Sequence, residues 1–359
     1  MTRNYALRGF FVFLFAIVLP SLLLARTESS ISFSQSEFFF YQEKGFTRIS
    51  LQNSRSLTQV GAPELPQKGI SLVIPQDVRV KGVKILSYER ELIEGEFYLY
   101  PTQEKVPIGY PPAPFVDPDA QIYDSELPYP GKIMEITGDG FMEGFHLVHL
   151  LVYPLEYIPK QRKLYLYTDI EFEIEYVDAK RSYFQPTHTS ESTINRLSSL
   201  VHNPEDVKLN EPKRMLAKPG TLLCDSIPYV IITTDTLKST YETLKEWKTK
   251  KGTKTEIKTI SEIDTEYSGY GVDLAEKIKN FIIDARVYWY TEWILFGGDV
   301  DSIPVRYTWH GAELGYTSLT DHYYSCLDNM WNSDGDDKWA EVFGDITDLE
   351  PDGIDVGRI

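Results

Sequence analysis

The chain has 359 residues, of which 42% are hydrophobic, so it is long and apolar enough for two or three folded domains and too apolar for a globally disordered chain. Its formal net charge of −17 argues against nucleic-acid binding, which requires a basic face. The acidity is typical of a soluble surface, with cation sites as an alternative, and the 24 tyrosines and 18 phenylalanines favour a β-rich component.

Residues 1–25 have the pattern of a secretory signal peptide. Two arginines precede an apolar run over residues 9–24, and Ala25 offers a small residue for cleavage. An uncleaved membrane anchor is the alternative, because the run approaches the roughly 18 residues needed to span a bilayer, although Pro20 interrupts it. Both interpretations predict export, and cleavage would leave no stable membrane span.

Residues 26–177 are predicted to form a β-sandwich-like domain. Short alternating or apolar segments recur between Pro- and Gly-containing breaks, and helical periodicity is nearly absent. Period-two alternation places one face of each strand in a core. The clearest such segments cover residues 47–51, 70–75, 78–83 and 163–167.

Residues 178–227 are predicted to be an interdomain linker, partly helical over 191–200. The segment is polar and lacks a sustained strand pattern. Basic, unpatterned stretches of this kind are where proteases cut, so Lys213 and Arg214 are the predicted processing positions. The alternative is an ordinary tether.

In residues 228–359 the spacing of apolar residues changes to the pattern of an α/β domain. Apolar strands are expected at 229–234, 255–260 and 294–296, with amphipathic helices between them. Asp235 is expected to cap the first helix and Gly252 to end it. Strands that alternate with helices require right-handed crossovers, so this domain is predicted to be a doubly wound parallel sheet.

The last of these strands ends in Gly297-Gly298-Asp299, at the kind of sheet edge where open α/β folds place their sites. A calcium-loop pattern follows, with oxygen-bearing side chains at loop positions three and five, Gly at position six and Glu at position twelve. The first position departs from the pattern, because a methionine stands where an aspartate is expected. A solvated acidic turn is the alternative. The candidate ligands of a structural calcium are Asp328, Met330, Asn332, Asp334, Asp336 and Glu341.

The chain has two cysteines, Cys224 and Cys326, so it is not a disulfide scaffold. They would either form one bridge or remain two buried thiols. Cys326 with His310 or His322 is the only Cys/His pairing inside the α/β segment.

Six motifs in the same order resemble the gingipain-type cysteine peptidases. They are residues 61–66 with 73–75, residues 229–233, residues 244–252, residues 294–304, residues 321–324 with 331–336, and residues 356–359. The first of these is similar to the β-rich propeptide of that family and the others to the start of its peptidase domain. The resemblance covers nearly the whole chain.

This resemblance implies a caspase-like α/β fold and hydrolysis of peptide bonds in protein or peptide substrates by a His/Cys dyad. In the family the dyad follows the Val-Gly-Arg strand, so it is expected beyond Ile359 and the peptidase domain here would be truncated and inactive by itself. Asp321 corresponds to an acid in the family's site region, which makes it the candidate for a substrate pocket, with a turn-capping acid as the alternative. Structural calcium near this region is also implied.

The resulting expectation is a secreted or cell-surface zymogen whose own propeptide acts as inhibitor. Two alternatives stay open. One is a sortase-like transpeptidase of the same family, and the other is a non-catalytic calcium-binding or adhesion module. Cleavage specificity is not predicted, because most of the pocket would lie downstream.

Overall fold

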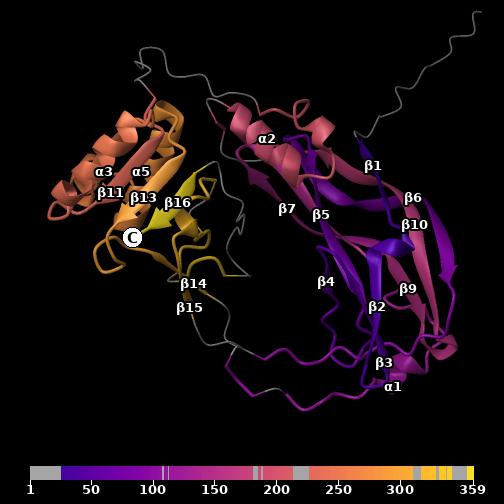
Figure 1. Cartoon of the computed structure of the whole chain (residues 1–359). Coiled ribbons are helices and arrows are strands. Elements are labelled where there is room, and N and C mark those ends of the chain that lie inside the picture. Colours follow the sequence, from indigo (N-terminus) through magenta and orange to yellow (C-terminus); the bar gives the residue numbers. More distant parts are fainter. Residues whose placement is uncertain are drawn as a thin grey trace, which may run out of the picture.

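The computed structural model describes residues 26–106, 109–111, 113–180, 185–186, 189–212, 226–309, 317–328, 331–336, 338–341 and 354–359 (Figure 1). The predicted signal peptide lies outside these ranges. No helix within them is long and apolar enough to cross a membrane.

The N-terminal domain consists of two four-stranded sheets and a hairpin (Figure 1). The first sheet has the order β1-β10-β6, with β9 also pairing β10, and the second has the order β4-β5-β8-β7. The strands of the first sheet are β1 (Arg26–Ser32), β6 (Val78–Ile93), β9 (Leu155–Ile158) and β10 (Lys163–Asp178). Those of the second are β4 (Arg55–Ser56), β5 (Pro66–Ile74), β7 (Met134–Met142) and β8 (Phe145–Val152), and the hairpin pairs β2 (Phe38–Glu43) with β3 (Phe46–Leu51).

One hydrophobic core joins the two sheets, as a β-sandwich-like domain requires. Alternate residues of β10, such as Ile170 and Phe172, are buried against Leu72 of β5 and Val148 of β8. Three short helical turns also belong to this domain: η1 (Gln35–Glu37), α1 (Ala120–Tyr123) and η2 (Pro159–Gln161).

The β6–β10 ribbon is longer than its sequence pattern indicates. Its pairing runs from Val78 opposite Asp178 to Ile93 opposite Leu164, whereas the alternating patterns at 78–83 and 163–167 mark only part of it. Three register shifts interrupt the pairing. Each bulge changes which face a side chain takes, so the period-two signal fades along a continuous strand.

Part of the predicted linker is folded onto the N-terminal domain. Helix α2 (Glu191–Leu200) and turn η3 (Pro204–Asp206) lie within residues 178–227. Leu197 and Val201 are buried in a cluster with Phe145 and Leu147 of β8. The apolar face of α2 therefore makes this stretch a structural part of the β-rich domain.

The C-terminal domain contains a parallel sheet, as predicted, and its four strands have the order β12-β11-β13-β16 (Figure 1). Its elements are β11 (Tyr229–Thr233), α3 (Lys238–Lys250), β12 (Thr255–Thr259), α4 (Ile260–Glu266), α5 (Leu274–Trp289), β13 (Trp293–Gly297) and β16 (Asp355–Arg358). A hairpin of β14 (Arg306–Trp309) and β15 (Thr317–Thr320) is followed by η4 (His322–Tyr324).

Helices cover both faces of this sheet, so it is doubly wound. Val230 and Ile294 face α5, whereas Ile231 and Leu295 pack with Tyr241 of α3. Two boundary predictions are wrong. The N-cap of α3 is Leu237 without a side-chain cap bond, so Asp235 is not the cap. Ile260 begins α4 because Thr259 forms a capping box there.

Candidate functional site

Three strand ends meet at one edge of the parallel sheet. In the register of these strands, Thr233 of β11 lies opposite Gly297 of β13, and Phe296 lies opposite Arg358 of β16. The Thr233 hydroxyl donates a 2.6 Å hydrogen bond to the Gly297 carbonyl. Because open α/β sheets bind ligands outside the carboxyl ends of their strands, this edge is the candidate site.

Arg358 ties three segments together at this edge. Its Nε and Nη2 donate to the two carboxylate oxygens of Asp321, at 2.8 and 2.6 Å. Its Nη1 donates to the carbonyls of Gly298 and Ile303, at 3.1 and 2.9 Å. The guanidinium also lies 5.0 Å from the ring centroid of Phe296. A planar guanidinium with donors in a fixed fork suits this geometry, so Arg358 fixes the loop after β13 and the start of η4.

The predicted pocket residue Asp321 lies at the candidate site, with both carboxylate oxygens bound to Arg358. This pairing gives Asp321 a positioning role at the edge, and its contact with a substrate stays a prediction. In the sequence, Arg358 stands out only as part of a motif, and its contacts at this edge were not predicted. The local sequence gives little signal for such a role, because β16 is short and none of its residues is fully buried.

A second group of charged side chains packs against Tyr323 of η4. The Lys279 ammonium lies 4.0 Å from the centroid of the Tyr323 ring, and the Arg306 guanidinium lies 4.7 Å from it. Burial raises the pKa of Tyr323 to about 12, so its hydroxyl is neutral near pH 7. Arg306 in turn forms a bidentate pair with Asp273, at 2.6 and 2.9 Å. Asp273 is the N-cap of α5, so one carboxylate joins that helix to β14.

Replacing Asp273 with asparagine is expected to destabilise this domain by about 1.5 kcal/mol at pH 7, because asparagine still caps the helix but no longer pairs with the buried Arg306 guanidinium. Desolvation raises the pKa of Asp273, but the bonds from Arg306 and from backbone amides outweigh it and leave that pKa below its usual value. A lowered carboxyl pKa stabilises the fold above the unfolded value of about 3.9, and that stabilisation is lost as the pH falls below it.

Urea unfolding followed by tryptophan fluorescence checks this, because all six tryptophans lie between Trp247 and Trp339 and report on the C-terminal domain. The difference between wild type and Asp273→Asn should be constant from pH 6 to 8 and should shrink below about pH 4. A difference that is independent of pH would contradict an electrostatic role.

Cys326 and His322 lie in contact next to the candidate site. The Sγ of Cys326 is 3.4 Å from His322 Nε2, and Ser325 Oγ is 3.1 Å from His322 Nδ1. Cys326 is 1% exposed, so a peptide carbonyl cannot reach its sulfur. The contact therefore supports packing of η4 rather than nucleophilic attack.

The predicted calcium loop brings three of its candidate ligands together. Carboxylate oxygens of Asp334, Asp336 and Glu341 lie within 4.8 Å of one another, which suits oxygen ligands around one calcium ion. The Lys338 ammonium lies 3.3 Å from Asp336 Oδ2 and 3.7 Å from Glu341 Oε2.

Other candidate ligands in this loop have different surroundings. Asn332 Oδ1 accepts the backbone N–H of Gly335 at 2.8 Å, which shapes the turn. Asp328 is not part of the group of three carboxylates. Met330 lies outside the described residues.

The remaining sequence predictions fall outside the described ranges. They concern the processing positions Lys213 and Arg214, the Cys224 partner of a bridge, and the pairing with His310.

Comparisons with known proteins match both halves of the chain. The model described as peptidase family C25 matches residues 224–359, and the model described as Propeptide_C25 matches residues 20–208. No curated protein matches the chain.

Five solved chains are similar, and two of them are described here. The complex of Porphyromonas gingivalis RgpB pro- and mature domains is 16% identical with a TM-score of 0.42, over 50% of this chain and 93% of that one. A structure of gingipain K from Porphyromonas gingivalis, concerned with zymogenic latency, is 21% identical with a TM-score of 0.37, over 45% of this chain and 97% of that one.

Proposed function

The chain belongs to peptidase family C25, and from this we propose that it is the zymogen form of an exported gingipain-type cysteine endopeptidase. Residues 26–212 would be the propeptide and residues 228–359 the start of a caspase-like peptidase domain. The observation that supports this most is the carboxyl edge, where Arg358 organises three segments around the ends of β13 and β16.

The proposed reaction is peptide-bond hydrolysis by a thiolate and an imidazole supplied by residues that follow the Val356-Gly357-Arg358 strand. The thiolate attacks the carbonyl carbon, the imidazole protonates the leaving amine, and water then releases the acyl group. The residues described here would hold the edge on which that dyad is displayed. Asp321 would line the neighbouring pocket while Arg358 keeps its carboxylate oriented.

An active-site thiol probe on the full-length protein tests this proposal. After cleavage in the segment 213–225, an acyloxymethyl ketone probe should label one cysteine, and labelling should persist in a Cys326→Ser variant. Mass spectrometry of a cleaved peptide should show a free carboxylate. Transfer of the acyl group to an added amine would instead indicate a transpeptidase. Absence of labelling, or its loss in Cys326→Ser, would overturn the proposal.

We also propose that the loop 328–341 holds a structural calcium through Asp334, Asp336 and Glu341. The support is the convergence of their three carboxylates. Calcium would replace the Lys338 ammonium as the counter-charge and fix the loop close to the candidate site. It would do no chemistry there.

Calcium is expected to raise the free energy of unfolding of the C-terminal domain by about 2.7 kcal/mol when present at 100 times its dissociation constant. Glu341→Gln should abolish this gain, because it removes a charged ligand. Glu246→Gln is the matched control, since Glu246 is an exposed helical acid paired only loosely with Lys250. Fluorescence-detected melting with calcium, magnesium or chelator measures the effect, and equal shifts in both variants would contradict the site.

A further inference from the structure

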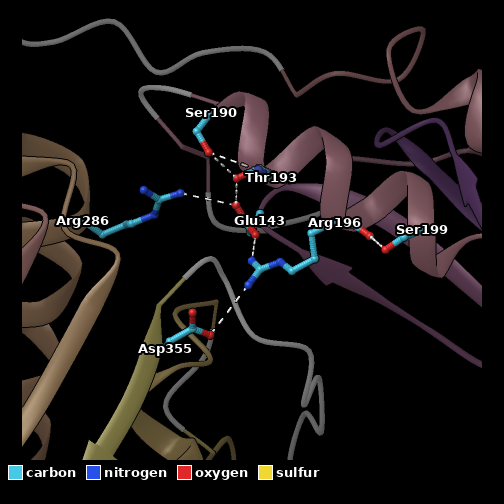
Figure 2. A network of polar contacts seen from close by, with 7 residues as sticks. All are labelled: Glu143, Ser190, Thr193, Arg196, Ser199, Arg286 and Asp355. Carbon is cyan, nitrogen blue, oxygen red and sulfur yellow. Dashed lines mark hydrogen bonds and ion pairs between the residues drawn. The ribbon is translucent and has the colours of Figure 1, made fainter.

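A buried glutamate joins the two domains. Glu143 is 1% exposed, and its carboxylate contacts two arginines and a hydroxyl (Figure 2). Arg196 of α2 donates to Oε1, while Thr193 donates to Oε2 at 2.5 Å. Arg286 of α5, in the other domain, lies 3.5 Å from Oε2. Arg196 also reaches across to Asp355, at 3.7 Å. These four charged side chains, alternately positive and negative, therefore form a chain of ion pairs that links the two domains.

The backbone conformation at position 143 is one that glutamate rarely adopts. Glu143 and Gly144 form the two-residue turn between β7 and β8, and both have positive φ, +54° and +79°. Such turns favour Asn, Asp or Gly at the first position, because other side chains are strained there. A glutamate held in a left-handed conformation is a reason to look for a function of its side chain.

Apolar packing does not hold the two domains together at this contact. Among the described residues, each hydrophobic cluster belongs to one domain alone, either at or before Val207 or from Ile227 onward. A cavity of about 130 Å³ lies at the contact and is lined by Glu143, Thr193, Arg196, Arg286, Glu292, Trp293 and Asp355. The observed attraction between the domains is therefore electrostatic.

The contact lies at the amino edge of the parallel sheet, opposite the candidate site. Asp355 is the first residue of β16, whereas Arg358 at its other end holds the carboxyl edge. The three intervening steps span roughly 10 Å at about 3.3 Å each. A residue that acts at the amino edge can thus affect docking without touching the site.

We infer that Glu143 anchors the propeptide to the peptidase domain through Arg286, so that the propeptide stays bound after the chain between them is cut. This inference rests on the proposed zymogen, whose regulation it extends. Two residues from one domain and two from the other form the anchor: Glu143 and Arg196 with Arg286 and Asp355. The inner pair, Glu143–Arg286, is buried and carries most of the affinity, since charges shielded from water and ions attract each other more strongly than exposed ones.

The test uses the full-length protein with a recognition sequence for an added, specific protease placed in the segment 213–225. After complete cutting, the dissociation rate of the tagged N-terminal fragment is measured on a sensor surface. Glu143→Gln and Arg286→Gln are each expected to raise this rate about 30-fold or more. The double variant should be no worse than the more affected single variant, because both remove the same interaction.

Glu173→Gln is the matched control. Glu173 is a buried carboxylate that also binds two cations, Arg26 at 2.9 Å and Lys84 at 3.0 Å, but it lies entirely within the propeptide. Its loss disturbs the same domain without touching the other and should leave the dissociation rate unchanged. Glu143→Asn adds a variant whose side chain suits the turn, so that its faster dissociation cannot result from a damaged hairpin.

The dependence on salt distinguishes the inner pair, Glu143–Arg286, from the outer pair, Arg196–Asp355. Asp355 is 64% exposed, so Asp355→Asn should raise the dissociation rate up to about fivefold at low salt and not at all near 1 M, where the Debye length is about 3 Å. The effect of Glu143→Gln should persist at 1 M because that pair is shielded from ions.

Equal dissociation rates for wild type, Glu143→Asn and Arg286→Gln would overturn the anchor, as would an equal effect of Glu173→Gln. This assay needs no catalytic activity. A propeptide that dissociates faster from a protein without a reactive thiol would support the anchor and contradict the proposed peptidase. A reactive peptidase with unchanged dissociation would do the reverse.

Discussion

Replacing Arg358 with alanine is expected to lower the free energy of unfolding of the C-terminal domain by about 4 kcal/mol. The guanidinium makes four hydrogen bonds to Asp321, Gly298 and Ile303. Its removal would leave a partly buried carboxylate and two carbonyls without their donor. Urea unfolding followed by tryptophan fluorescence measures the loss on this domain alone.

Two further variants show whether the geometry of the guanidinium or only its charge matters. Arg358→Lys keeps the charge but cannot bind a carboxylate in bidentate fashion and also reach two carbonyls, so most of the loss should remain. In an Asp321→Asn background, Arg358→Ala should cost much less, because no uncompensated carboxylate is then left. Full recovery in Arg358→Lys would show that a point charge suffices and would contradict the proposed positioning role.

A local measurement tests what such positioning does. Amide exchange in residues 298–303 should accelerate in Arg358→Ala beyond the change expected from global stability, because Arg358 binds both ends of that loop. Exchange that changes uniformly over the domain would indicate a general loss of packing instead.

The α/β architecture was predictable because its signals are local. Residues 229–233 and 293–297 are apolar runs of strand length, and the helix between 274 and 289 repeats its buried positions with helical period. Parallel order then follows from chain connectivity. For the β-rich domain only the fold class was predicted and not the strand lengths, because β-bulges interrupt the alternation along β6 and β10.

The contacts that build the site were not predictable in the same way. Asp321 and Arg358 are 37 positions apart, and Glu143 and Arg286 are 143 apart. Side-chain partners at such separations depend on how whole elements pack, which leaves no local pattern in the sequence. The calcium loop is the opposite case, because the three candidate ligands that come together, Asp334, Asp336 and Glu341, are close in sequence and their proximity follows from spacing.

A second large effect is expected from Gly297→Ala at the end of β13. A Cβ at this position would lie 2.5 Å from two ring carbons of Tyr241 and 2.9 Å from its hydroxyl oxygen. Contacts this short would force the Tyr241 ring, and with it α3, away from the sheet. We expect destabilisation of about 3 kcal/mol, the upper end for overpacking of a filled core.

The glycine thus permits α3 to lie close to the carboxyl edge, and a second substitution can show this. Tyr241→Ala removes the ring and should itself cost stability, because Tyr241 packs with Ile231 and Leu295. If the clash is the cause, the double variant should be more stable than the sum of the two single losses predicts, by about 2 kcal/mol.

Additive losses would instead place the effect in the backbone of Gly297, whose carbonyl accepts the Thr233 hydroxyl. That outcome would make the glycine a requirement of the strand ends themselves. The coupled outcome would make it a requirement of the helix that covers them. In both cases the position affects the edge held by Arg358, since Gly298 follows directly and its carbonyl binds that arginine. Substitution at Gly297 should therefore also raise amide exchange in residues 298–303, and a stability loss without that change would separate the glycine from the candidate site.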